Sequence, residues 1–375
     1  MIEQVAIPQN MLKRRVAWFM LTGSIILCLV ALLLYAVSTP VFHTAPSLQK
    51  VTDVPLPGGQ PTFDQQAFDA GSKHLFVTHP GNNEVVIIDT TTNAVVGHIQ
   101  NIRKNHGIAV IPELNRVYVG ETFDNQVYVV DEKTLAILSR IPVGQKPDVI
   151  SYDPNDHLLF VSNELGHSDA VINVNTNRVI ATIPFGGEVG NTRYDPTTHR
   201  IFITLQTLNQ VVALDPVSRK IVASVTLPKT CNHNHGLILD TSQHLGIVEC
   251  DVSTNLFLLD ISSMQVLTSQ PLPQQPDIMA IDEGQHQIYV SSRSGNLAIF
   301  NDSNKSLQKV AEECVATNAH SVFVDPGTHT IYMPLLSTSS TVCAVPTPAP
   351  TPKPNTTPVP APVNGQPALR VLQFQ

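Results

Sequence analysis

The sequence predicts an all-β repeat fold, and three observations indicate it. Short runs of β-branched and aromatic residues alternate with Pro, Gly, Asn and Asp turns, in a chain of 375 residues that is 42% hydrophobic and only 14% charged. An apolar tetrad recurs at intervals of 42 to 45 residues, and an Asp or Asn at the following turn recurs nearly in phase with it. Four strands in roughly 40 residues form one blade of a β-propeller, so seven tetrads predict seven blades. The tetrads begin at Leu75, Val117, Leu159, Ile201, Gly246, Ile288 and Ile331.

One repeat, residues 117–154, shows how a blade is built. A short apolar strand and a polar loop are followed by a second strand, which ends at a turn opened by Asp131. A third strand spans 135–143, and after a Gly/Pro loop a fourth strand ends at Asp153 and Pro154. Because each such unit packs only on its neighbours, a chain of this size needs no single central core.

The two ends of the repeat region are predicted to share one blade. The segment KVTDVPLPGG, from Lys50, resembles outer strands elsewhere in the chain but precedes the first complete blade. The last blade has strands predicted at 321–325, 331–335 and 369–374, and it lacks a fourth. The N-terminal strand therefore completes it and closes the ring, which removes an open sheet edge.

The N-terminal region predicts a membrane anchor. Residues 1–15 end in a basic cluster, Lys13 to Arg15, and residues 16–38 carry no charge. These 23 residues are long enough to cross a hydrocarbon core. The basic cluster before them predicts that the N-terminus stays in the cytoplasm and that the propeller, 49–375, lies outside. Residues 39–48 form a tether between the span and the propeller. The alternative is a signal peptide cleaved near Ala36-Val37-Ser38, which would release a secreted protein.

A Pro-rich insertion is predicted within the last blade, at 337–368. Nine prolines fall between Pro346 and Pro367, a composition that favours a solvated, polyproline-II-like loop over packed structure. The net charge of the chain is −8, and no basic patch is present, so nucleic acid is excluded as an expected partner.

The repeats resemble those of a known family. The stretches VIIDTTTNAVVGHI (86–99), VYVVDEKTLAILSRIPVG (127–144) and INVNTNRVIATIPFGG (172–187) are similar to repeats of the bacterial YncE-like, YVTN-type seven-bladed propeller proteins. The resemblance covers roughly residues 50–375. It implies the fold and no particular reaction, since the family has no common established one.

The repeat register predicts a ring of ionisable residues. Standard catalytic motifs, among them G-x-S-x-G, H-E-x-x-H and C-x-x-C, are missing. Pro112, Pro154 and Pro196 occupy equivalent positions in successive repeats. The residue six positions before each of them, and its equivalent in every other repeat, lies on the loop that enters the innermost strand of a blade. We expect these residues to meet at one mouth of the central channel: Asp64, His106, Asp148, Gly190, His235, Asp277 and His320.

Two interpretations of this ring stand. The imidazoles could bind a divalent transition metal or a small ligand, with the carboxylates orienting them. Alternatively, the polar groups only solvate a water-filled channel mouth. A three-residue insertion before His235 also allows a local chelate of Cys231, His233 and His235, although such spacing in a loop is weak support.

Two function classes follow from the ring. In the first, the protein is a membrane-held binding module whose small ligand or protein partner sits on the ring face. In the second, a ring-bound metal activates water in a hydrolase or lactonase-like reaction, with Glu121 or Asp251 as the base. The requirements of the binding module are already met, so we favour it.

Four cysteines lie in the part expected to be exported. The order and direction of the strands bring Cys231 close to Cys250 on one hairpin, and Cys314 close to Cys343 at the same face of the last blade. We therefore predict disulfides between these pairs in an oxidising compartment, and four free thiols in a reducing one. The fifth cysteine, Cys28, falls in the expected membrane span.

Overall fold

A computed structural model describes residues 47–59, 62–338, 343 and 365–374. The expected membrane span, 16–38, lies outside the described residues, as does most of the Pro-rich insertion. Within the part that is described, no helix is long and apolar enough to span a membrane. Residues Ser47–Gln375 form one compact unit.

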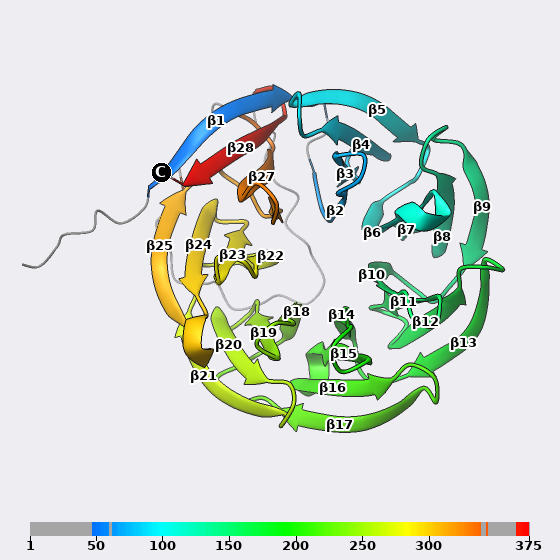
Figure 1. The fold of residues 1–375 in the computed structure, drawn as a ribbon, viewed down its shortest axis with the longest axis vertical. Helices are drawn as coiled ribbons and strands as arrows, with labels where there is room; N and C mark the ends of the chain where they lie inside the picture. The colour runs from blue at the N-terminus through cyan, green and yellow to red at the C-terminus, as the bar shows by residue number, and fades with distance from the viewer. Residues whose placement is uncertain (1–46, 60–61, 339–342, 344–364, 375) are drawn as a thin grey trace, which may run out of the picture. The chain divides into compact units, whose positions relative to one another are not determined.

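This unit is a seven-bladed propeller of four-stranded antiparallel sheets (Figure 1). In each blade the first strand lies next to the central axis and the fourth lies at the periphery. Blade one comprises β2 (Gln66–Asp69), β3 (His74–His79), β4 (Glu84–Asp89) and β5 (Ala94–Gln100). Blade two comprises β6 (Asn105–Ile111), β7 (Arg116–Glu121), β8 (Gln126–Asp131) and β9 (Ile137–Pro142). Blade three comprises β10 (Pro147–Asp153), β11 (Leu158–Asn163), β12 (Ser168–Asn173) and β13 (Arg178–Pro184).

The next three blades repeat this order. Blade four comprises β14 (Val189–Asp195), β15 (Arg200–Leu205), β16 (Gln210–Asp215) and β17 (Lys220–Thr226). Blade five comprises β18 (Asn234–Asp240), β19 (Leu245–Cys250), β20 (Asn255–Asp260) and β21 (Gln265–Pro271). Blade six comprises β22 (Pro276–Asp282), β23 (Gln287–Ser292), β24 (Asn296–Asn301) and β25 (Gln308–Cys314). Short 3-10 turns lie at Pro112–Leu114, Gln206–Leu208 and Ser303–Lys305.

Blade seven joins the two ends of the propeller, as predicted. Its strands are β26 (Phe323–Asp325), β27 (Thr330–Leu335), β28 (Ala368–Phe374) and, outermost, β1 (Leu48–Pro55). β1 pairs antiparallel with β28 from Leu48 opposite Phe374 to Pro55 opposite Ala368. The Arg370 guanidinium donates two hydrogen bonds to the Asp53 carboxylate, from Nε to Oδ1 at 2.8 Å and from Nη2 to Oδ2 at 3.0 Å. This bidentate contact fixes the register of the closing strand pair.

Recurrent Asp and Asn residues shape the turns between third and fourth strands. At the end of β8, Asp131 Oδ1 accepts hydrogen bonds from the backbone N–H groups of Lys133 and Thr134, at 3.1 and 2.8 Å. Leu135 follows with φ of 57°, in the left-handed region that closes such a turn. Asp or Asn therefore recurs at these positions because its side chain accepts the backbone hydrogen bonds that form the turn.

The hydrophobic core is divided among the seven blade boundaries. Each boundary holds its own cluster of buried side chains, drawn from the two facing sheets. At the boundary between blades seven and one, Val54 and Leu56 from the N-terminal segment are 5% and 1% exposed and pack with Leu369 and Val371. The N-terminal strand is therefore part of the core as well as of the sheet.

Two disulfides occur at the pairings expected from strand order. Cys231, just before β18, bonds to Cys250 at the end of β19, with a Cα separation of 5.5 Å. Cys314, at the end of β25, bonds to Cys343 with a Cα separation of 5.7 Å. Since Cys231 is bonded, its sulfur is not a thiolate ligand, and the local chelate with His233 and His235 loses one of its three members.

Candidate functional site

The loops that enter the innermost strands surround a cavity of about 210 Å³ at one end of the channel. Five of the seven ring positions line this cavity, and they come from blades one, two, three, five and six. The lining residues are Asp64, Gln65, His106, Lys146, Asp148, Glu164, Gln206, His233, His235, Asp251, Pro276, Asp277 and Arg293. Five of the seven residues predicted from the repeat register therefore meet at a common polar site.

His106 and Asp64 form the tightest pair in the cavity. His106 Nδ1 lies 2.5 Å from Asp64 Oδ2 and 3.6 Å from Asp148 Oδ1. Burial would raise the pKa of Asp64, but the His106 imidazole lowers it to about 2. Burial would likewise lower the pKa of His106, but Asp64 raises it above its usual value. The two side chains therefore form a half-buried ion pair in which each group favours the charged form of the other, and Asp148 faces the cavity beyond hydrogen-bond distance of His106.

The ring position of blade four is Gly190, and the backbone of His235 in blade five passes too close to it for a side chain to fit. A Cβ at Gly190 would lie 2.4 Å from the carbonyl oxygen of His235 and 2.5 Å from Thr204 Oγ1. The His235 ring itself contacts Gln206, with Nδ1 3.1 Å from Oε1. The absence of a side chain at the fourth ring position thus lets blades four and five close on each other.

His320, the ring residue of blade seven, lies behind the cavity wall. It is 4% exposed, and its Nδ1 lies 3.0 Å from the carbonyl oxygen of Asn318. Its Nε2 lies 4.0 Å from Asp277 Oδ2, and that oxygen is 2.5 Å from the Arg293 guanidinium. Burial and the Arg293 charge lower the pKa of His320, so this imidazole is neutral at pH 7.

The loop insertion before β18 places His233 in the cavity beside Asp251. His233 Nδ1 lies 2.9 Å from Asp251 Oδ1, and Nε2 lies 3.6 Å from Glu188 Oε2. Burial would lower the pKa of His233, but its hydrogen bond to Asp251 and the Glu188 carboxylate raise it. Asp251 thus serves as a partner of His233, whereas Glu121, the other base considered, is fully buried and does not line the cavity.

Three lining residues, Glu164, Gln206 and Arg293, were not predicted from the sequence, and a fourth, Asp251, was considered only as a possible base, because the ring was taken from the inner-strand entry loops alone. Glu164, Gln206, Asp251 and Arg293 each follow the last residue of a second strand, in blades three to six. The second strand runs antiparallel to the first, so its end lies on the face where the first strand begins. The residue after each second strand is therefore a repeat position that the sequence could have shown. Lys146 is a further missed residue, and it pairs with Glu164 across the cavity wall.

The three ring histidines do not share a metal-binding geometry in the structure. His106, His235 and His320 are each directed to a separate partner, namely Asp64, Gln206 and the Asn318 carbonyl. Among the described residues, groups of three or more side-chain ligand atoms within 4.8 Å of one another occur elsewhere. These groups are Asp153 with Asp156 and His199, and Asp240 with His286 and Asp302.

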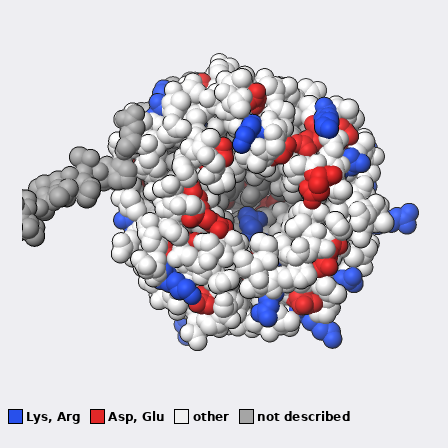
Figure 2. All heavy atoms as spheres, in the orientation of Figure 1, with Lys and Arg blue, Asp and Glu red and all other residues white. Residues whose placement is uncertain are grey.

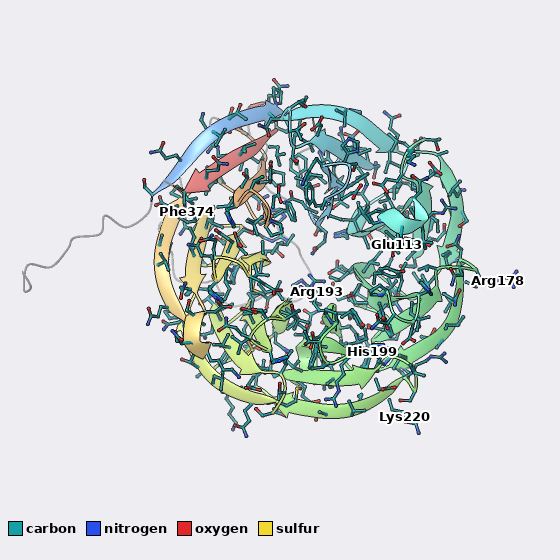
Figure 3. The ribbon with its side chains drawn as sticks, viewed as in Figure 1. Glu113, Arg178, Arg193, His199, Lys220 and Phe374 are labelled. Carbon is teal, nitrogen blue, oxygen red and sulfur yellow. A yellow bond between two sulfur atoms is a disulfide. The ribbon has the colours of Figure 1, made fainter. Side chains whose placement is uncertain are left out.

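The channel beyond the cavity also carries charge. Figure 2 shows one face of the propeller, hollowed at its centre, with acidic side chains around the hollow and a basic group inside it. In the same orientation, Arg193 of β14 lies at the inner edge of the ring (Figure 3). Burial lowers the pKa of Arg193 to about 10, and the nearby Asp148 carboxylate opposes this effect. Both signs of charge therefore line the axis of the protein.

Comparison with known proteins supports the fold. No family model and no curated protein sequence matches the chain. Among solved structures, the hydrazine synthase of Kuenenia stuttgartiensis is similar over 74% of this chain and 94% of its own, with a TM-score of 0.66 and 17% identity. A chain in the crystal structure of the mitotic checkpoint complex is similar over 76% of this chain and 90% of its own, with a TM-score of 0.66 and 12% identity. At such identities the likeness shows the seven-bladed architecture alone.

Proposed function

We propose that this protein is a YncE-like, YVTN-repeat propeller that acts as a binding module. In this proposal the helix at 16–38 anchors it to the membrane, and the propeller on the extracytoplasmic side takes a small ligand, or one side chain of a protein partner, into the cavity at the channel mouth. The repeats quoted from residues 86–187 support the family placement. The uncharged run after the basic cluster supports the topology.

The observation that carries the proposal is the convergence of charged groups from five blades on one small cavity. Thirteen residues line about 210 Å³, and most of the charged ones already have partners within the wall. Such pairing holds side chains in place before any ligand arrives, which lowers the ordering cost of binding. Ligand pockets are concave sites of this kind, with a few converging polar groups.

The balance of charge favours a cationic ligand. The lining holds five carboxylates, and four of them are paired with a basic side chain: Asp64 with His106, Asp251 with His233, Glu164 with Lys146 and Asp277 with Arg293. The Asp148 carboxylate is therefore the negative charge left for a ligand even when both imidazoles are protonated. Asp148 faces the cavity with an oxygen 3.6 Å from its nearest imidazole nitrogen, so it can accept a hydrogen bond from a ligand. A cavity of 210 Å³ is smaller than the roughly 300–1,000 Å³ of drug-sized sites. We therefore propose a small amine, or a Lys or Arg side chain, as the bound group.

The proposal does not extend to catalysis. The hydrolase alternative needs several ring histidines on one metal, and the structure directs each of them to a different protein partner. No geometric observation in the cavity supplies an open coordination position beside a base. The binding module therefore remains the function that the geometry supports best.

The test is a calorimetric and thermal-shift titration of the full-length protein in detergent. The probes are matched cations and anions of similar size: ethanolamine, lysine amide and arginine amide against acetate and phosphate. We expect the cations to bind, and Asp148→Asn to weaken that binding at least about tenfold, the loss of one charge-assisted hydrogen bond. Glu312→Gln, which removes an exposed carboxylate from the outer strand β25, serves as the matched control and should bind as the wild type does. Binding of the anions alone, or equal affinities in wild type and Asp148→Asn, would reject the cationic site.

A further inference from the structure

A His–Asp contact recurs across the blade boundaries at the turns between first and second strands. Asp153, Asp240 and Asp282 each end a first strand, and the histidine in the equivalent turn of the next blade reaches back to each of them. The distances are 3.5 Å for His199 Nε2 to Asp153, 3.9 Å for His286 Nδ1 to Asp240, and 2.5 Å for His329 Nδ1 to Asp282. At the boundary between blades six and seven this contact is a simple inter-blade hydrogen bond.

The boundary between blades five and six differs from both others because a second carboxylate that enters it is fully buried, whereas Asp156, which contacts His199 between blades three and four, is 30% exposed. Asp302, which follows β24, is fully buried, and its Oδ1 lies 3.7 Å from His286 Nδ1. Neither carboxylate oxygen of Asp302 has a hydrogen-bond partner among the residues that the structure describes. A buried carboxylate without partners is costly, so something must neutralise it.

The neighbouring carboxylate is held in place by its own partners. Asp240 Oδ1 accepts hydrogen bonds from Ser242 Oγ at 2.6 Å and from the Gln243 backbone N–H at 2.9 Å. Its Oδ2 accepts one from Gln243 Nε2 at 2.7 Å. The same Nε2 lies 3.2 Å from His286 Nδ1, where it can donate only if that nitrogen carries a lone pair. Two carboxylates and an imidazole thus point at one space.

We propose that Asp240, His286 and Asp302 form a binding site for a divalent transition metal ion, of the Zn²⁺ or Mn²⁺ class, that clamps blade five to blade six. One ligand atom from each residue lies within 4.8 Å of the other two. A tetrahedral ion with bonds of about 2.1 Å separates its ligand atoms by about 3.4 Å. The observed 3.7 and 3.9 Å are longer than that value by about 0.3 and 0.5 Å, so small side-chain shifts would bring the three atoms to one ion.

The ligand chemistry selects the class of ion. One imidazole nitrogen with two carboxylate oxygens suits borderline ions, whereas Ca²⁺ and Mg²⁺ prefer sites built from oxygen alone. The His286 side chain is 41% exposed while both carboxylates are fully buried, so an ion can enter past the imidazole and keep water on its open side. The ion would be the positively charged partner of the buried Asp302 carboxylate.

A proton shared between the two carboxylates is the competing explanation. Burial, and then the Asp240 charge, raise the pKa of Asp302 to about 7, so this group can hold a proton near neutrality. The two explanations differ in what they predict for metal content. A shared proton requires no ion, whereas a clamp loses its ion when any one of its ligands is removed.

The test compares the zinc content of the full-length protein in detergent after chelator treatment and dialysis against ZnCl₂. Wild type should hold one equivalent more zinc than Asp302→Asn and His286→Gln, by mass spectrometry of the metal. His329→Gln is the matched control, because it removes the equivalent histidine at the boundary between blades six and seven. Among the described residues, no third ligand joins His329 and Asp282 there, so this variant should retain the wild-type zinc content. Zinc should also raise the melting temperature of wild type and His329→Gln by about 3 °C or more, and leave Asp302→Asn unchanged.

Equal zinc content in wild type, Asp302→Asn and His286→Gln would overturn the proposal, whatever other sites the protein has. A zinc-independent melting temperature in wild type would do the same. If Asp302→Asn does not fold, His286→Gln alone decides the question, because the His286 side chain is 41% exposed whereas Asp302 is fully buried. With chelator present, Asp302→Asn should melt at or above wild type, since the amide removes an uncompensated buried charge.

Discussion

Removing the N-terminal strand should open the propeller at blade seven. We compare two truncations, one beginning at residue 47, which keeps β1, and one beginning at residue 57, which removes β1 and Leu56. The first retains the whole compact unit and should fold normally. The second leaves β28 as an exposed edge, with a row of unpaired backbone groups.

The size of the effect follows from what the strand buries. Val54 and Leu56 are 5% and 1% exposed, and burial of each contributes about 1.5–3 kcal/mol. The two hydrogen bonds from Arg370 to Asp53 link charged groups, and this partly buried pair contributes about 1.5–3 kcal/mol. Together these amount to about 5–9 kcal/mol, which is comparable with the whole stability of a typical domain, about 5–15 kcal/mol.

Thermal melting and size-exclusion chromatography of both truncations provide the assay. The shorter protein should aggregate or melt far below the longer one. The single change Asp53→Asn in the longer protein isolates the ion pair and should cost about 1–3 kcal/mol. Equal melting temperatures of the two truncations would refute the closure argument, because they would show that β1 adds nothing to the folded ring.

Three further predictions concern the disulfide, the cavity and the topology. The double change Cys231→Ala with Cys250→Ala should lower the free energy of unfolding by about 3 kcal/mol, because the bond closes a loop with a sequence separation of 19; an unchanged denaturation midpoint under oxidising conditions would contradict this. Since the folded pKa of His106 is raised by Asp64, its contribution to stability is full below the unfolded pKa of about 6.5 and is lost as pH rises through the folded value. Asp64→Asn should therefore lower the pKa of His106 measured by NMR, and an unchanged titration would show that the pair is not coupled. A reporter that is active only in the cytoplasm, fused to the C-terminus, should be silent, and activity in a membrane-bound fusion would reverse the proposed orientation.

The sequence by itself determined the architecture of the described unit. Each blade is specified locally, by an apolar tetrad and by a turn such as that at Asp131, so the repeat period counts the blades. The closing strand followed from a missing fourth strand in the last repeat, and β1 occupies that place. The pairings of Cys231 with Cys250 and of Cys314 with Cys343 followed from strand direction alone. All of these depend on chain order and on the alternation of antiparallel strands.

Only the tertiary structure decided which side chains meet. The register placed His320 in the ring, yet it packs behind Asp277 and Arg293, while Arg293 takes a place in the cavity wall. The contact between Asp240 and His286 recurs at equivalent positions of other blades, but Asp302 follows a third strand, and only the folded structure brings it to the other two. The physical reason is that a repeat sets the position of each backbone, whereas contacts across a blade boundary depend on side-chain rotamers and on the twist of both sheets.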